Sequence, residues 1–286
     1  EWHIVHAYDD YAEVIRTGDP HEFGYFSAIG GYWSSLCSLT EESAALGEID
    51  TSTKQLVYVI GVSFTFEMLV KAAYEETLGR MAALLRGHER APLDDLSAEQ
   101  AAGYANFLQQ VPWHQYDFRA DADALRAAST GSLRDWERAA ALGFEHRNRA
   151  AYAEVIAAAV EATGPDELTL QMVVTGLPED ALTSVDGVSL IGTVGEGLAV
   201  ETPRYRQLTG ILANWANAGA DFLDIAGNDQ IMFTAISDQA AQEGALASLP
   251  RQGYGDTRHL FLLPVTDLAD TLRGLEARDL LLELIH

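Results

Sequence analysis

The sequence predicts an α+β protein with an N-terminal all-α region and a C-terminal α/β region. In the first part, apolar residues recur three and four positions apart in long Ala- and Leu-rich segments, which is the periodicity of amphipathic helices. In the second part, short runs rich in β-branched residues lie between turn signals, as strands do. The change occurs at "EATGPDEL", where Gly164 and Pro165 are expected to end a helix. We therefore expect two domains, residues 1–164 and 165–286.

Composition limits the classes of partner and of site. The chain has 286 residues, 43 acidic and 18 basic, with a formal net charge of −25. This charge repels a polyphosphate backbone, so we expect no nucleic-acid partner. The single cysteine, Cys37, excludes an intramolecular disulfide and a Cys-based zinc cluster. There is no P-loop, HExxH or GxSxG pattern, so no cofactor is expected and the prediction leans against an enzyme.

The helical region is expected to contain six helices. Ser97 with Gln100 has the spacing of a capping box, and Ser132 with Asp135 resembles one. Two of the helices would each run about 50 Å at 1.5 Å per residue, so they are expected to pack along one another. The predicted helices span residues 4–17, 21–46, 52–87, 97–110, 120–128 and 132–163.

The stretch "LVYVIGVSFTFEMLV", Leu56 to Val70, is apolar except for Glu67. It is shorter than the roughly 20 residues of a membrane span. Placing Glu67 and Lys71 in lipid would cost roughly 2.5–3.5 kcal/mol each. We interpret the stretch as a buried central helix. A membrane-associated segment and the wall of a binding site are the alternatives.

The other long helix carries a cluster of cations in "SLRDWERAAALGFEHRNR". If it packs along residues 52–87, its arginines can meet Glu67, Glu75 and Glu76, because guanidinium pairs well with carboxylate. A structural ion network is the preferred interpretation. Adjacent helical residues point about 100° apart, so Glu145 and His146 are poorly placed as a catalytic dyad. The alternative is a small-ligand site, and its candidate residues are Glu67, Lys71, Arg138, His146, Arg147 and Arg149.

A metal site is a further hypothesis for the opening "HIVHAYDD". His3, His6 and Asp10 are spaced so that one helical face carries all three. No fourth donor or second shell is recognisable nearby, which counts against the metal interpretation.

The C-terminal region is predicted to be a ferredoxin-like sandwich with a mixed sheet. Helices are expected after Pro203, Ser237 and Thr266. The strand–helix–strand order of "HLFLLPVTDLADTLRGLEARDLLLELI" favours a parallel pair joined by a crossover. "DIAGNDQI" and "GTVGEG" are expected to be hairpin turns. The predicted strands span residues 168–174, 187–192, 198–202, 221–225, 230–236, 259–265 and 280–285.

These observations predict a non-enzymatic interaction or scaffold protein, whose partner is another protein or a second copy of the chain. The sequence begins at Glu1, without a signal segment, so we expect trimming before this residue. One form of this prediction is that the chain is the soluble part of a bacterial cell-envelope protein, located in the periplasm or envelope. It would then contact a membrane only through an anchor that has been removed. The alternative is a small-ligand-binding protein, or an enzyme of unrecognised type, with its site between the helical and α+β regions.

Overall fold

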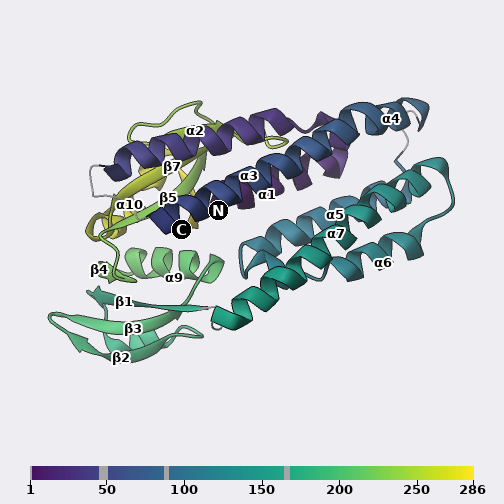
Figure 1. The fold of residues 1–286 in the computed structure, drawn as a ribbon. Coiled ribbons are helices and arrows are strands. Elements are labelled where there is room, and N and C mark those ends of the chain that lie inside the picture. Colours follow the sequence, from purple (N-terminus) through teal and green to yellow (C-terminus); the bar gives the residue numbers. More distant parts are fainter. Residues whose placement is uncertain (1, 45–50, 87–89, 164–167) are drawn as a thin grey trace. The chain divides into compact units, whose positions relative to one another are not determined.

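The computed structural model describes residues 2–44, 51–86, 90–163 and 168–286 (Figure 1). They form an α+β protein, as predicted. The chain divides into two compact units. We call them the helical unit (1–108, 112–164 and 252–254) and the sheet unit (109–111, 165–251 and 255–286). The predicted boundary at Gly164 and Pro165 lies outside the described residues.

The predicted helices are all present in the helical unit. A π-helical segment joins α3 to α4, so residues 51–86 are helical throughout, close to the predicted 52–87. One predicted start is wrong: α5 begins at Pro92, and Ser97 lies inside it, donating to the carbonyl oxygen of Asp94 at 2.9 Å. The elements are α1 (Trp2–Thr17), η1 (Pro20–Glu22), α2 (Tyr25–Ala44), α3 (Thr51–Tyr74), η2 (Glu75–Gly79), α4 (Arg80–Arg86), α5 (Pro92–Leu108), η3 (Trp113–Gln115), α6 (Phe118–Ala128) and α7 (Leu133–Thr163).

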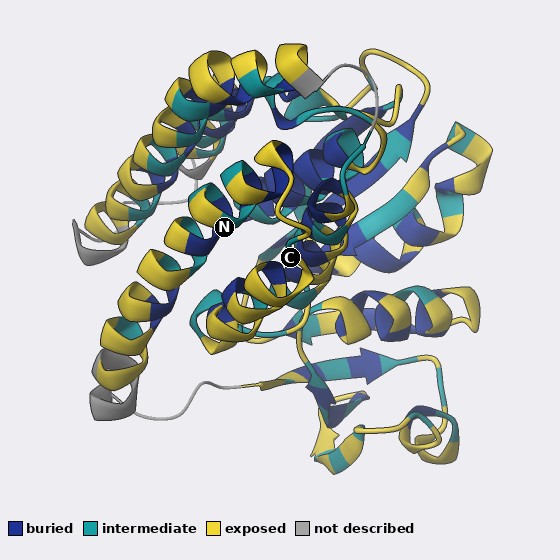
Figure 2. Cartoon of the chain, turned by 90° about the vertical axis from the view of Figure 1, so that its right-hand side faces the viewer, coloured by how far each residue is buried: buried dark blue, intermediate teal, exposed yellow. Residues whose placement is uncertain are grey.

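Aromatic side chains fill the core of the helical unit. Tyr11 of α1 meets Phe23 edge to face, with ring centroids 5.3 Å apart, and Phe23 meets Tyr25 in the same way at 5.0 Å. Such pairs add to the burial of apolar area. The helices consequently carry buried residues on one side and exposed residues on the other (Figure 2).

The sheet unit holds two four-stranded sheets, ordered β2-β3-β1-β4 and β6-β7-β5-β8. The seven predicted strands are present, and the short β6 was missed. Between them lie α8 (Glu179–Thr183), α9 (Arg206–Asn217) and α10 (Leu268–Gly274). The strands are β1 (Thr169–Thr175), β2 (Ser189–Val194), β3 (Gly197–Pro203), β4 (Asp221–Ile225), β5 (Gln230–Ser237), β6 (Ala247–Pro250), β7 (Thr257–Pro264) and β8 (Leu281–Ile285).

The predicted mixed sheet is wrong, but the ferredoxin-like order is present: β1, α8, β2, β3, α9 and β4 follow one another as β-α-β-β-α-β, in a sheet ordered β2-β3-β1-β4. Every strand pair among the described residues is antiparallel. β7 and β8 do run in the same direction, because each is antiparallel to β5, but β5 lies between them. The connection through α10 therefore passes over one strand instead of joining two neighbours.

Two local predictions in the sheet unit fail and one holds. "DIAGNDQI" is not a hairpin, since β4 and β5 belong to different sheets. Residues 238–246 form turns and loop, not the helix expected after Ser237. The "GTVGEG" segment does form the turn between the antiparallel strands β2 and β3.

Two glycines with positive φ allow a test of close packing in the sheet unit. Gly176 has φ 84°, and a methyl group there would overlap the carbonyl oxygen of Gly219. Gly195, in the β2–β3 turn, has φ 59° and open space around it. We expect Gly176→Ala to lower the free energy of unfolding by roughly 2–4 kcal/mol, from backbone strain plus overlap. The control Gly195→Ala should lower it by only about 1 kcal/mol. Urea unfolding measures both, and equal losses would contradict the assignment.

Candidate functional site

The seam between α3 and α7 is ionic. The carboxylate of Glu67 pairs with Arg149, and Lys71 Nζ lies 2.9 Å from Glu145 Oε1. Tyr8 of α1 joins this group: its hydroxyl donates to Glu67 Oε1 at 2.5 Å and accepts from Arg149 Nη2 at 2.6 Å. As residue numbers rise along α3, those of the partners fall along α7, so the two helices run antiparallel.

Further along the seam, Arg138 and Glu75 form a bidentate ion pair. Arg138 Nη1 and Nη2 each donate to one carboxylate oxygen of Glu75 at 2.9 Å. Both side chains are almost fully buried, 1% and 6% exposed. The predicted network of α7 arginines with Glu67 and Glu75 is therefore confirmed. Its third member is not, because Glu76 pairs with Arg80 on its own helical stretch.

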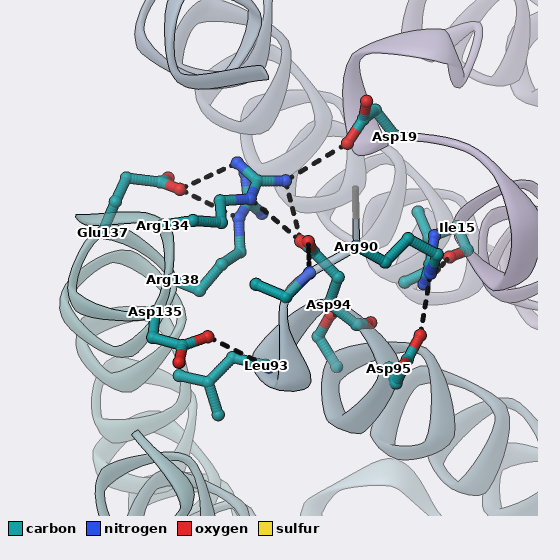
Figure 3. Close-up of polar contacts among 12 residues, drawn as sticks. Ile15, Asp19, Arg90, Leu93, Asp94, Asp95, Arg134, Asp135, Glu137 and Arg138 are labelled. Carbon is teal, nitrogen blue, oxygen red and sulfur yellow. Dashed lines mark hydrogen bonds and ion pairs between the residues drawn. The ribbon is translucent and has the colours of Figure 1, made fainter. Parts of the chain in front are cut away.

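Arg134 links α7 to two other elements, a role that the sequence did not reveal. Its guanidinium contacts Asp94 of α5 at 2.9 Å, Glu137 at 2.8 Å and Asp19 at 3.3 Å (Figure 3). Its side chain is 4% exposed. Glu137 also accepts from Arg138 at 3.1 Å, so this group is continuous with the ionic seam.

A small cavity of about 40 Å³ lies beside the seam. Two buried atoms of its lining residues, Gln100 Oε1 and His146 Nδ1, have no hydrogen-bond partner among the residues that the structure describes. The volume admits one or a few water molecules, at about 10–15 Å³ of probe volume each, and excludes a metabolite. The lining comprises Tyr8, Tyr11, Ile15, Lys71, Ser97, Gln100, Ala101, Tyr104, Leu142, Glu145, His146 and Arg149.

Three of the cavity residues have defined protonation states at neutral pH. Burial lowers the pKa of Lys71, but the adjacent Glu145 more than offsets it, so this pKa is raised and the amine stays charged. Burial raises the pKa of Tyr8, which keeps its proton. Burial lowers the pKa of His146, so the imidazole is neutral at neutral pH. A charged amine and a protonated phenol are weak nucleophiles and bases, and this arrangement suits a structural network better than catalysis.

The predicted ligand-site residues are all in the helical unit, but they do not form one site. Lys71, His146 and Arg149 line the cavity, and Glu67 reaches it through its pair with Arg149. Arg138 is committed to Glu75. Arg147 is exposed and lines a separate surface depression of about 320 Å³ with Arg119 and Asp123.

The metal hypothesis finds no support in the geometry. His3, His6 and Asp10 are buried on one face of α1, as their spacing predicts. His3 Nε2, however, is hydrogen bonded to the carbonyl oxygen of Ala28 at 2.8 Å. Within the described ranges, no three His, Cys, Asp or Glu side chains are arranged to hold a metal ion.

The interpretation of Leu56 to Val70 as a buried helix is wrong. Only one side of α3 is buried, the side that carries Gly61, Phe64, Met68 and Ala72. Large apolar side chains on the other side, continuing into η2 and α4, are 43–79% exposed. We call this set the exposed apolar face: Leu56, Tyr58, Val59, Val62, Phe66, Leu69, Val70, Leu78, Met81, Leu84 and Leu85.

The same helical stretch stands out by length and composition. Among the described residues one helix, Lys54–Leu85, is long and apolar enough to cross a membrane. The core helix of a globular protein can also pass this test, but such a helix is mostly buried. Here only 22% of the most apolar window is buried.

One polar cluster of the sheet unit was also not predicted. His259 of β7 is fully buried, and its Nε2 and Nδ1 lie 2.9 Å from the hydroxyls of Ser237 and Ser248. The three residues come from the neighbouring strands β5, β7 and β6. With both ring nitrogens occupied by hydroxyls inside the sheet, the cluster satisfies buried polar atoms across three strands.

Comparisons with known proteins add no family: no family model, no curated protein and no solved structure matches the chain.

Removing one side of the Arg138–Glu75 pair should destabilise the helical unit strongly. We expect Arg138→Ala to lower the free energy of unfolding by about 3–5 kcal/mol, because Glu75 would remain as an unpaired buried charge. The matched control is Arg119→Ala, which breaks a pair with Glu154 whose side chains are 65% and 64% exposed. It should cost at most about 1 kcal/mol. A similar cost for both, measured by urea unfolding, would contradict the buried network.

His146 should make stability depend on pH. Its pKa in the fold is lowered below the ordinary value of about 6.5 by burial, with Glu145, Asp121 and Lys71 nearby. A lowered histidine pKa means that the unfolded chain binds the proton first, so stability is lost as pH falls below about 6.5. Wild type should therefore lose more unfolding free energy across that pH than His146→Gln. Parallel pH profiles of the two proteins would exclude this role.

Proposed function

We propose that the protein is a non-enzymatic interaction protein that docks a partner on the exposed apolar face of α3–α4. The observation that carries the proposal is the exposure of large apolar side chains along one continuous helical stretch, Leu56 to Leu85. The largest apolar patch on a typical monomeric protein is about 300–600 Å² and is often functional. Side chains of this size and exposure, gathered on one helix, together present roughly 1,000 Å².

The positions of the charged side chains favour a surface that docks a partner rather than a binding site for a small metabolite. The ionisable groups that could serve chemistry are buried and paired in the ionic seam, and the cavity beside them holds only a few atoms. The large apolar side chains of α3–α4 lie on the exposed side of the helix, away from these paired groups. A helix that lays its apolar side against a partner is a recurring mode of protein recognition. Two of the residues predicted for small-ligand binding, Lys71 and Arg149, are accounted for by the structural network.

A substitution on the exposed apolar face tests accessibility without knowledge of the partner. We expect Phe66→Arg to reduce the fluorescence of a hydrophobic dye such as ANS several-fold at low protein concentration, because Phe66 lies 68% exposed near the middle of the face. The matched control is Ile191→Arg on β2 of the sheet unit, where the side chain is 51% exposed. It should leave dye binding nearly unchanged. Equal dye binding by wild type and Phe66→Arg, with native circular dichroism, would reject this docking face.

A further inference from the structure

We propose that the occupant of the exposed apolar face is a second copy of this chain, with α3 packed against α3 about a two-fold axis. The inference rests on the proposed function and names its partner. In a two-fold interface, each residue of one copy that contacts a residue of the other is contacted in return by its equivalent. A surface can serve both sides only if it is complementary to itself.

The middle of the face meets that requirement because it carries no charge. From Gln55 to Ala73, the exposed residues of α3 are apolar or uncharged, and the ionisable Glu67 and Lys71 are committed to the seam with α7. Two such surfaces meet without burying an unpaired charge, which would cost several kcal/mol per ion if it occurred.

The area is that of a stable dimer. The seven large apolar residues between Leu56 and Val70 are 43–68% exposed. Together they present on the order of 800 Å², which is about what one partner contributes to an interface of standard size. Met81, Leu84 and Leu85 extend the same face beyond this stretch.

A lipid bilayer is a poorer fit as the occupant. Helices that lie on membrane surfaces carry many Lys and Arg residues beside their apolar face, which attract anionic headgroups. This chain has a net charge of −25 and only two lysines, Lys54 and Lys71, the second of which is paired with Glu145. An acidic chain is repelled by an anionic surface.

Sedimentation equilibrium of the full chain tests the dimer. Wild type should show a monomer–dimer equilibrium, and Phe66→Arg should weaken association at least a hundredfold by placing a charge at the centre of the interface. Ile191→Arg is the control that should associate like wild type. Monomeric wild type at all concentrations, or a dimer unaffected by Phe66→Arg, would overturn the inference.

The outcomes also separate this inference from the proposed function. If wild type stays monomeric while Phe66→Arg still reduces dye binding, the docking face stands and the second copy is the wrong partner. If monomeric wild type co-sediments with phosphatidylcholine vesicles and Phe66→Arg does not, a bilayer is the occupant and the dimer is overturned. If the dye does not distinguish wild type from Phe66→Arg at concentrations where both are monomeric, both proposals fail.

Discussion

The ionic seam between α3 and α7 is the constraint on which the helical unit depends. A charge that is partly or wholly removed from water is stabilised by pairing, and Glu67, Lys71 and Glu75 of the α3–η2 stretch pair with Arg149, Glu145 and Arg138 of α7. Helical periodicity then fixes where every other residue of α3 points. Gly61, Phe64, Met68 and Ala72 fill the buried side, and the large apolar residues that remain are directed to the surface. The exposed apolar face is thus a geometric consequence of the seam.

Leaving such a face in water is unfavourable. Burial of apolar area contributes about 25 cal/mol per Å², so a surface on the order of 800 Å² represents a large unrealised stabilisation for an isolated chain. Association realises only part of it, because two molecules lose translational and rotational freedom. Repulsion between two acidic chains opposes association too, but it is screened beyond about 8 Å at physiological ionic strength. The face itself carries no charge between Lys54 and Glu76, so contact there adds no local repulsion.

The sequence predicted what local patterns determine and missed what depends on distant contacts. The helices follow from periodicity, and the pairing of Arg138 and Arg149 with Glu75 and Glu67 follows from guanidinium chemistry. The exposure of Leu56 to Val70 does not follow, because a helix that is apolar nearly all round gives no periodic signal to separate its buried side from its surface. The strands were found from composition, whereas the sheet order, with β5 between β7 and β8, depends on non-local pairing. The four residues of β6 are too few to produce a pattern.

The seam also explains why α3 and α7 adopt a single register. A one-turn slip in one direction would set Lys71 against Arg149 and Glu75 against Glu145. A slip in the other direction would set Glu67 against Glu145. Each alternative brings like charges together in a poorly solvated space, whereas the observed register pairs every one of these groups with its opposite. Buried ion pairs add little net stability, but here they exclude the neighbouring arrangements. Because the register is fixed, the side of α3 that is presented to solvent is fixed with it.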